Sequence, residues 1–200
     1  MARIITLDEE SHQYTVDGEP IPSVSEITRF ISREIYGDVS QYALENAASR
    51  GTKVHKATEA LDKFGDAEVD EEIAPYVEAY VRFRREHKVK WIHIEWMLDY
   101  KDQFCGTLDR TGEIDGVETL VDIKTSSSLQ KVLYTAQLSL YMMLARENGY
   151  EPKKMLILHL MKDGNYKLVE LQENAELANA LLTLHNALKK KPRKRKEKEQ

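Results

Sequence analysis

Two acidic residues and a lysine stand in this chain in an order that could support metal-dependent hydrolysis. Asp109 is followed by Asp122 and Lys124, and the Asp115-Gly116 dipeptide between them is typical of a two-residue hairpin loop. Such a loop places Asp109 directly opposite Asp122, with Lys124 on the same face. Two opposed like charges destabilise a sheet, whereas a bound divalent cation would make the pair favourable. The set is suited to phosphodiester hydrolysis, in which a metal and a lysine activate water and stabilise charge on the phosphate.

The two faces of the predicted hairpin differ in polarity. The face of the two aspartates also carries Thr107, Thr111, Leu120 and Lys124. The opposite face carries the apolar residues Leu108, Val121 and Ile123, with Arg110 as its polar exception. Mg²⁺ prefers oxygen ligands, so the backbone carbonyl of Ile123 could complete a site made by the carboxylates. The alternative is a surface hairpin with solvated charges, which the hairpin alone does not exclude.

Other polar residues could extend this site. His55 and Glu59 share one face of a predicted helix, as do Gln137 and Tyr141 on another helix, because residues four apart are neighbours on a helix surface. A helical histidine can be a metal ligand, although packed or exposed histidines are commoner. Gln137 could instead be a hydrogen-bonded helix residue beside a core tyrosine. Glu95, on a predicted strand, is either a further acidic site group or a surface glutamate.

These residues need a scaffold of helices and strands to bring them together. Ser23 and Glu26 form a capping-box signature that opens a first helix. Longer helices are predicted over Val39–Phe64, Glu71–His87, Leu129–Asn148 and Ala175–Leu188. Strands are predicted over Ile4–Leu7, Gln13–Val16, Trp91–Leu98, Phe104–Ile114, Val117–Thr125, Met155–Met161 and Tyr166–Leu171.

The order of these elements predicts the fold class. Helices are followed by three antiparallel strands, a helix and more strands, which indicates an α/β (α+β) protein with a mixed central sheet flanked by helices. In the strand Trp91–Leu98 we expect Ile92, Ile94, Trp96 and Leu98 to share one face, with Glu95 on the other.

Length and charge set the domain organisation that we expect. The 200 residues suit one domain with a sizeable core, which we place at residues 1–188 with its centre at about 39–171. Residues 189–200 hold eight basic and two acidic residues, although the whole chain has a net charge of −5. This basic segment is predicted to be a disordered tail, either an arm that meets a polyanion or a solvated tail without such a role.

The remaining composition excludes several classes of protein. The single cysteine, Cys105, allows neither an internal disulfide nor a four-cysteine iron–sulfur cluster within the chain. The sequence has no apolar run long enough for a membrane span, and its first ten residues lack a signal-peptide pattern. We therefore expect a cytoplasmic protein without a membrane partner.

In combination, the motifs resemble a known family. Glycine-x₃-histidine at residues 51–55, G-x-x-D at 106–109, D-x-K-T at 122–125 and Q-x₃-Y at 137–141 resemble the RecB-type branch of the PD-(D/E)XK nuclease superfamily. The stretch 12–27 is similar to the N-terminal segment of phage-encoded exonucleases and of the related mitochondrial genome maintenance exonuclease. The resemblance covers most of residues 1–171.

This resemblance implies a fold and a role for each matching residue. The expected fold is a restriction-endonuclease-like core with an N-terminal β-hairpin. The implied metal ligands are His55, Asp109, Asp122 and the Ile123 carbonyl, for Mg²⁺ or Mn²⁺. Lys124 matches the catalytic lysine, and Leu108 replaces the proline of the superfamily name. The residues that would support the site or contact DNA are Gln137, Tyr141, Thr125 and Lys131. The cysteines that hold an iron–sulfur cluster in some relatives are missing, so no cluster is expected.

The expected activity is that of a DNA exonuclease serving phage-type recombination, replication or repair in a bacterial host. Single- or double-stranded DNA would be the substrate, and a single-strand annealing or replication protein is a candidate partner; an oligomer is compatible with the resemblance. One alternative is a structure-specific endonuclease with the same site. Another is a non-catalytic recombination accessory protein that binds nucleic acid through the basic tail. A small-molecule metallohydrolase is disfavoured because the sequence lacks clustered histidines.

Overall fold

A computed structural model describes residues 3–8 and 11–189 of the chain. The helices of this part are α1 (Val24–Tyr36), α2 (Gln41–Phe64), α3 (Ala74–Glu86), α4 (Lys131–Glu147) and α5 (Ala175–Lys189). The strands are β1 (Ile5–Asp8), β2 (Gln13–Val16), β3 (Glu19–Ile21), β4 (Val89–Tyr100), β5 (Phe104–Ile114), β6 (Val117–Lys124), β7 (Lys154–Leu160) and β8 (Tyr166–Leu171). The predicted basic tail lies outside the described residues except for Lys189, which ends α5.

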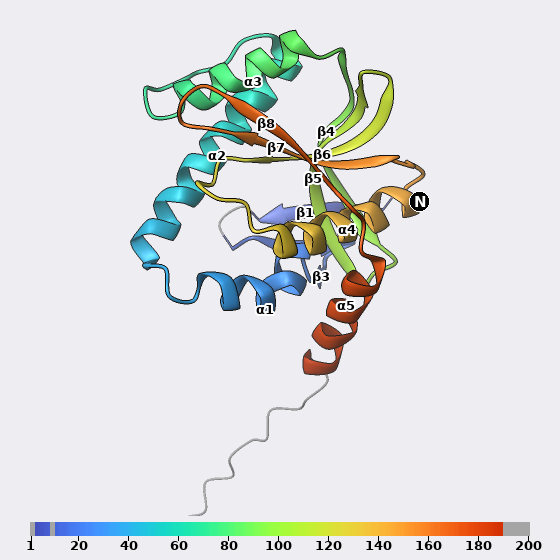
Figure 1. Cartoon of the computed structure of the whole chain (residues 1–200). Helices are drawn as coiled ribbons and strands as arrows, with labels where there is room; N and C mark the ends of the chain where they lie inside the picture. The colour runs from blue at the N-terminus through green and yellow to red at the C-terminus, as the bar shows by residue number, and fades with distance from the viewer. Residues whose placement is uncertain (1–2, 9–10, 190–200) are drawn as a thin grey trace, which may run out of the picture.

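A five-stranded mixed sheet forms the centre of the fold, in the order β4-β5-β6-β7-β8. Neighbouring strands are antiparallel except β6 and β7, which are parallel. Parallel strands require a crossover connection, and α4 supplies it. Figure 1 shows α2 and α3 on one side of this sheet and α1, α4 and α5 on the other. The predicted mixed α/β (α+β) sheet flanked by helices is therefore confirmed.

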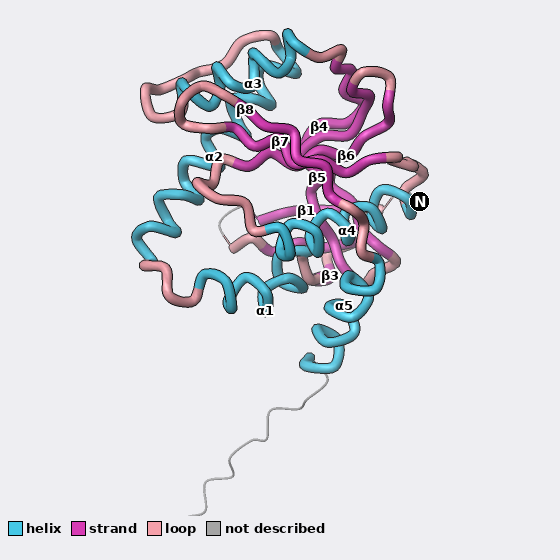
Figure 2. Tube along the Cα trace, in the orientation of Figure 1, coloured by secondary structure: helices cyan, strands magenta, loops and turns pink. Residues whose placement is uncertain are grey.

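The core is divided between the two faces of the central sheet, whose strands are magenta in Figure 2. One buried cluster joins the sheet to α1, α4 and α5 and includes Leu120 and Ile157. The other joins it to α2 and α3 and includes Val121 and Ile123. Successive residues of β6 thus enter different clusters, as expected when both faces of a strand are covered.

The N-terminal strands form a separate three-stranded sheet, in the order β1-β2-β3. Sequence analysis predicted its first two strands and the capping box that follows. Ser23 Oγ accepts from the Glu26 backbone N–H, and the Ser23 N–H donates to the Glu26 carboxylate. The Cys105 N–H donates to the Pro22 carbonyl at 2.8 Å, which ties this region to β5.

The central hairpin β5–β6 has the predicted two-residue turn. Asp115 and Gly116 both adopt positive φ, 51° and 83°, as a type I′ turn requires. The strands pair Thr111 with Leu120 and, as the last pair before the site, Arg110 with Val121. The register inferred from the turn is therefore confirmed up to Arg110 and Val121, the residues next to Asp109 and Asp122.

Two predicted side-chain orientations are wrong, and each residue lies beside an interruption of regular strand pairing. Ile92 is 51% exposed instead of buried, because the register shifts between Trp91 and His93 and Ile92 is the extra residue of a bulge. Leu108 packs in the cluster of α1, α4 and α5 instead of on the face of Val121 and Ile123.

The second irregularity lies at Glu95. Its φ is +48°, and it stands between Ile94 and Trp96, which pair with Arg110 and Leu108. Asp109, the residue after Leu108 in β5, forms no regular pair with β4 or with β6, so strict alternation need not hold across this point. Among the described helices, none combines the length and the apolarity needed to cross a lipid bilayer.

Candidate active site

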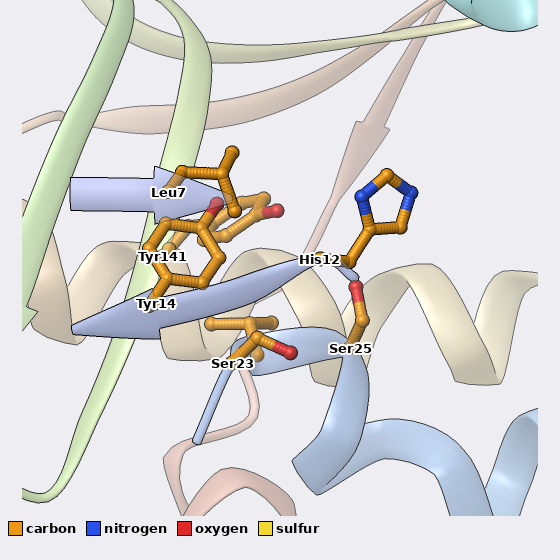
Figure 3. Close-up of a pocket in the computed structure, with 8 residues that line it drawn as sticks. Leu7, His12, Tyr14, Ser23, Ser25 and Tyr141 are labelled. Carbon is orange, nitrogen blue, oxygen red and sulfur yellow. The ribbon is translucent and has the colours of Figure 1, made fainter. Parts of the chain in front are cut away.

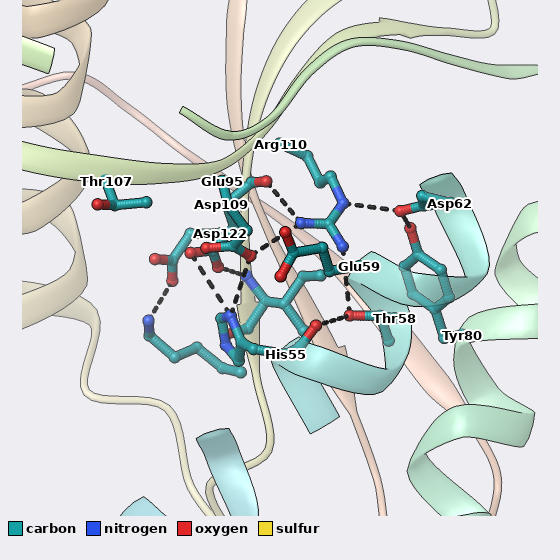
Figure 4. Close-up of polar contacts among 12 residues, drawn as sticks. His55, Thr58, Glu59, Asp62, Tyr80, Glu95, Thr107, Asp109, Arg110 and Asp122 are labelled. Atoms are coloured by element: carbon teal, nitrogen blue, oxygen red, sulfur yellow. Dashed lines mark hydrogen bonds and ion pairs between the residues drawn. The ribbon is translucent and has the colours of Figure 1, made fainter. Parts of the chain in front are cut away.

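The polar residues singled out in the sequence meet where β4, β5 and β6 lie against α2. Figure 4 shows His55 of α2 facing Glu95 of β4 and Asp109 of β5, with Asp122 beside them. His55 Nδ1 lies 3.7 Å from an oxygen of Glu95 and 3.7 Å from an oxygen of Asp109. One ligand atom from each of the three residues lies within 4.8 Å of the others. The grouping is of the kind that can hold a cation.

The His55 ring is oriented by a backbone contact. Its Nε2 lies 3.1 Å from the Ile123 carbonyl oxygen, which can only accept, so Nε2 carries the proton and Nδ1 faces the carboxylates. Burial disfavours the charged ring, but Asp109 and Glu95 outweigh this effect and raise the pKa of His55 to about 9. The acidic site therefore favours a positive charge at this position.

Asp109 and Asp122 have different surroundings. Asp109 Oδ2 accepts from the Ile123 backbone N–H at 2.6 Å. Asp122 is 1% exposed, and its Oδ2 is paired with the Lys124 ammonium, whose Nζ lies 2.6 Å away. Burial and the charge of Asp109 raise the pKa of Asp122 to about 6, against the opposing effect of Lys124. The surroundings of Asp122 in the folded protein therefore disfavour its charged form.

Lys124 lies at the end of β6 with part of its side chain open to solvent. Its ammonium is paired with Asp122 and lies 5.4 Å from the Tyr134 ring centroid. Burial disfavours the charged ammonium, but Asp122 and Asp109 outweigh burial and raise the pKa of Lys124. The lysine is therefore a cation at neutral pH, suited to stabilising negative charge and orienting a polar reactant.

Gln137 and Tyr141 of α4 lie on the other side of Asp122. Gln137 Nε2 donates to Tyr141 Oη at 3.1 Å and reaches Asp122 Oδ1 at 3.5 Å. A Cβ on Gly106 would lie 2.9 Å from the Tyr141 ring, so the glycine permits the close approach of α4 to β5. The two residues predicted to support the site thus do contact it.

A buried arginine, Arg110, joins the site to α2. Sequence analysis noted this residue only as a polar exception on an apolar face. Arg110 is fully buried. Its guanidinium donates to Glu95 at 3.0 Å, to Asp62 at 2.7 Å and to Thr58 at 3.3 Å. Asp62 also binds Tyr80 and Arg84. His55, Thr58 and Asp62 recur at helical spacing along α2, and that periodicity of polar residues was the available signal.

Three other predicted residues stand apart from the carboxylates. Glu59 pairs with Lys63 at 2.5 Å and is not one of the three clustered ligand residues. Thr125 is buried beside Gly51 of α2. Lys131 is exposed at the first residue of α4.

A pocket of about 220 Å³ adjoins Tyr141 on the side of the N-terminal sheet. Tyr14 and Tyr141 lie at one end of it, and His12 and Ser25 lie at the other, in the view of Figure 3. The Tyr14 hydroxyl is hydrogen-bonded to Thr107 of β5 at 2.8 Å. The N-terminal sheet therefore forms part of the wall beside the carboxylates.

Comparisons with solved structures find similar chains, of which one, from Eubacterium rectale, is similar enough to indicate the same fold. A protein with a provisional exonuclease designation from Eubacterium rectale aligns with a TM-score of 0.51 at 15% identity, over 84% of this chain and 77% of that one. The alkaline exonuclease LHK-Exo from Laribacter hongkongensis aligns at 0.42 and 13% identity, over 82% and 84% of the two chains. A phage-related exonuclease from Haemophilus somnus 129PT aligns at 0.39 and 11% identity, over 84% and 94%.

The sequence comparisons give the family. No curated protein matches the sequence. The family model described as the PD-(D/E)XK nuclease superfamily matches residues 27–198, which include α2, the central sheet and every residue of the site. The chain belongs to the PD-(D/E)XK nuclease superfamily.

Proposed function

We propose that the protein is a divalent-metal-dependent exonuclease that hydrolyses phosphodiester bonds of DNA. The observation that carries the proposal is the convergence of His55, Glu95 and Asp109 beside the buried pair of Asp122 and Lys124. Membership of a nuclease superfamily gives the reaction class, and this site offers the groups that the reaction needs.

The donor set fits Mg²⁺ or Mn²⁺. Asp109, Asp122 and Glu95 supply carboxylate oxygens, which both ions accept, and His55 supplies a nitrogen. Asp122 is buried with Lys124 as its cationic partner, and a bound cation would further offset the cost of burying its charge beside Asp109. In our assignment the metal is held by His55, Asp109, Asp122 and the Ile123 carbonyl, with Glu95 as a further acidic group. A bound ion would polarise the phosphate and lower the pKa of the attacking water.

The side chains around the reacting phosphate have separate tasks in this proposal. Lys124, held as a cation by Asp122, stabilises negative charge that develops on the phosphate and orients the water. Gln137 and Tyr141 hold Asp122 from the α4 side and, with Thr125 and Lys131, position the strand. We assign Glu59 no direct part because Lys63 occupies its carboxylate.

The exonuclease mode rests on two supports. The stretch 12–27 resembles the N-terminal segment of phage-encoded exonucleases, and the Eubacterium rectale protein of the same fold carries an exonuclease designation. We also propose that the protein serves phage-type recombination or replication. In this proposal residues 1–188 form one nuclease domain with its core at about 39–171, and the segment 189–200 is a basic arm.

A digestion experiment tests this function. The purified protein is incubated with Mg²⁺, Mn²⁺ or EDTA and with end-labelled linear single strands, linear duplexes and closed circular DNA. We expect metal-dependent loss of linear DNA and survival of the circles; cleavage of circles would instead indicate an endonuclease.

Matched variants connect the activity to the site. Asp122→Ala and Lys124→Ala should lose cleavage while retaining the fold. Glu113→Gln, which removes a carboxylate of β5 nearer the turn, should cleave like the parent. An Asp122→Ala protein as active as the parent would overturn the assignment, and a parent that binds DNA without any turnover would favour an accessory role.

A further inference from the structure

A second polar cavity lies beyond the carboxylates, where the ends of β6 and β7 meet α2. It has a volume of about 440 Å³. Its polar or aromatic lining residues are Arg50, Tyr76, Thr125, Ser126, Ser127, His159, Lys162 and Asp163. Two cations and the hydroxyls of Thr125, Ser126 and Ser127, together with that of Tyr76, form a set of donors suited to an anion.

Arg50 is the least satisfied of these donors. Its Nε is buried and makes no hydrogen bond with a described residue. The guanidinium carbon lies 5.6 Å from the Tyr76 ring centroid, which supports the stem and leaves the donor edge of the group available. Within residues 3–8 and 11–189 no carboxylate lies within ion-pair distance of Arg50 or of Lys162. The cavity thus carries positive charge that the folded chain does not neutralise.

The loop after Lys124 is fixed in place beside this arginine. His159 Nε2 donates to the Ser126 carbonyl at 2.7 Å, and Ser126 Oγ donates to the Ser128 carbonyl at 2.9 Å. The hydroxyls of Thr125 and Ser127 make no hydrogen bond with another described residue. They are held on an ordered loop with their donors unused, as expected of a preformed site.

The single acid of the lining does not fill the site. Asp163 is exposed and accepts the backbone N–H of Asn165 at 3.0 Å, which holds the β7–β8 turn. It forms no ion pair with Arg50 or Lys162. The cavity therefore keeps its two cations available.

The position of the cavity relates it to the reacting phosphate. Thr125 directly follows Lys124, and regular alternation sends their side chains to opposite sides of the chain. Arg50 precedes His55 by five residues on α2, which is about 7.5 Å of helix rise. A strand whose scissile phosphate lies at the carboxylates would bring a neighbouring phosphate to this distance.

We propose that Arg50, Thr125, Ser127 and Lys162 form a binding site for a non-scissile phosphate of the nucleic-acid strand being cut. This inference rests on the proposed function. Arg50 binds the phosphate through its fork of N–H donors, the two hydroxyls add hydrogen bonds, and Lys162 contributes charge from the rim. The site would fix which phosphate reaches Lys124, and so the length of each step along the strand.

The test separates binding from cleavage. Binding of fluorescent single-stranded and duplex oligonucleotides is measured by anisotropy in EDTA over a range of salt, and KM and kcat are measured with Mn²⁺. Arg50→Gln should weaken binding by about 10-fold to 100-fold. It should reduce the slope of log K against log salt by about 0.7 for single strands or about 0.9 for duplex. KM should rise while kcat changes little.

Three further variants serve as controls. Arg50→Lys should keep the salt slope and lose part of the affinity, since a lysine retains charge without the fork. Lys162→Gln, an exposed substitution, repeats the test if Arg50→Gln is poorly folded by its thermal unfolding. Lys153→Gln removes an exposed lysine at the opposite end of β7 and should match the parent.

Substrates with a 5′ phosphate, a 3′ phosphate or hydroxyl ends identify the phosphate. If the site binds an internal phosphate, Arg50→Gln should show the same defect on all three substrates. If the site binds a terminal phosphate, the defect should appear only on the substrate with that phosphorylated end. An active parent with Arg50→Gln and Lys162→Gln both indistinguishable from Lys153→Gln would overturn this inference alone. A parent that neither binds nor cuts DNA or RNA would overturn the proposed function as well.

Discussion

Arg110 Nη1 lies 3.0 Å from Glu95 Oε1, so a fully buried guanidinium directly orients an acid of the candidate metal site. The same guanidinium is paired with Asp62 of α2. The helix that carries His55 and the strand that carries Glu95 are thereby joined through one side chain.

Removal of this side chain should affect both stability and the site. Arg110→Met removes the hydrogen bonds to Glu95 and Thr58 and leaves Asp62 with only Tyr80 and Arg84, which should cost about 1–3 kcal/mol in the free energy of unfolding. Arg85→Ala, at an exposed position of α3, should stay within about 0.5 kcal/mol of the parent. Urea unfolding gives both values. An Arg110→Met protein as stable as the parent would show that the network contributes little.

Gly106 offers a way to displace Tyr141 without changing it. In Gly106→Ala the new Cβ would lie 2.9 Å from the Tyr141 ring and 3.0 Å from Leu144. The side chains must move, so we expect a loss of about 1–3 kcal/mol together with reduced cleavage. Gly116→Ala, strained by its φ of +83° but free of contacts, should lose stability and keep its kcat. Equal kcat values for the two variants would contradict a role for the Tyr141 position.

The charged form of Asp122 should lower the free energy of unfolding of the metal-free protein, although the site needs this carboxylate. Its pKa in the folded, metal-free protein is raised to about 6, so its charged form destabilises the fold above that pH. Asp122→Asn should therefore raise the free energy of unfolding of the metal-free protein at pH 7.5, by an amount on the order of 1–3 kcal/mol. The carboxyl's contribution is fully favourable below its unfolded pKa and is lost as pH rises through about 6.

The pH series supplies the check on that sign. Denaturation in EDTA should show the advantage of Asp122→Asn shrinking between pH 7 and pH 4. Glu113→Gln should show no such trend. An advantage that is constant with pH, or a destabilised Asp122→Asn protein, would mean that Lys124 stabilises the charged carboxylate more than burial disfavours it.

Metal binding should stabilise the folded protein by mass action. At a hundredfold excess of Mn²⁺ over its dissociation constant we expect about 2.7 kcal/mol, visible as a rise in Tm that EDTA reverses. Asp109→Asn and His55→Gln should lose most of this rise, and Glu113→Gln should keep it. An unchanged Tm for the parent at millimolar Mn²⁺ would contradict the proposed metal site.

The features that sequence patterns predicted are those set by local rules. The Asp115-Gly116 turn determines the register of β5 and β6, and Ser23 with Glu26 determines the start of α1. Each depends on residues close together in the chain, whose conformations follow from backbone sterics and hydrogen bonding. The spacing of short motifs likewise predicts His55 and Gln137 as site residues.

The features that the sequence did not predict depend on irregular backbone or on distant partners. Strict alternation misplaced Ile92, because a bulge interrupts β4. It also misplaced Leu108, which stands next to Asp109, where regular pairing with β4 and β6 is interrupted. The pairing of Arg110 with Asp62 joins residues far apart in the chain, and no local pattern specifies such a contact.

The two-residue turn also makes the length of β6 critical for the site. Side chains alternate between faces along a strand, so one residue inserted into or deleted from β6 between Gly116 and Asp122 would exchange the positions of Asp122 and Ile123. A carboxylate would then enter the apolar layer under α2 and α3, and an isoleucine would face the phosphate. A change of one residue in the length of β6 would therefore disrupt the site and the core together.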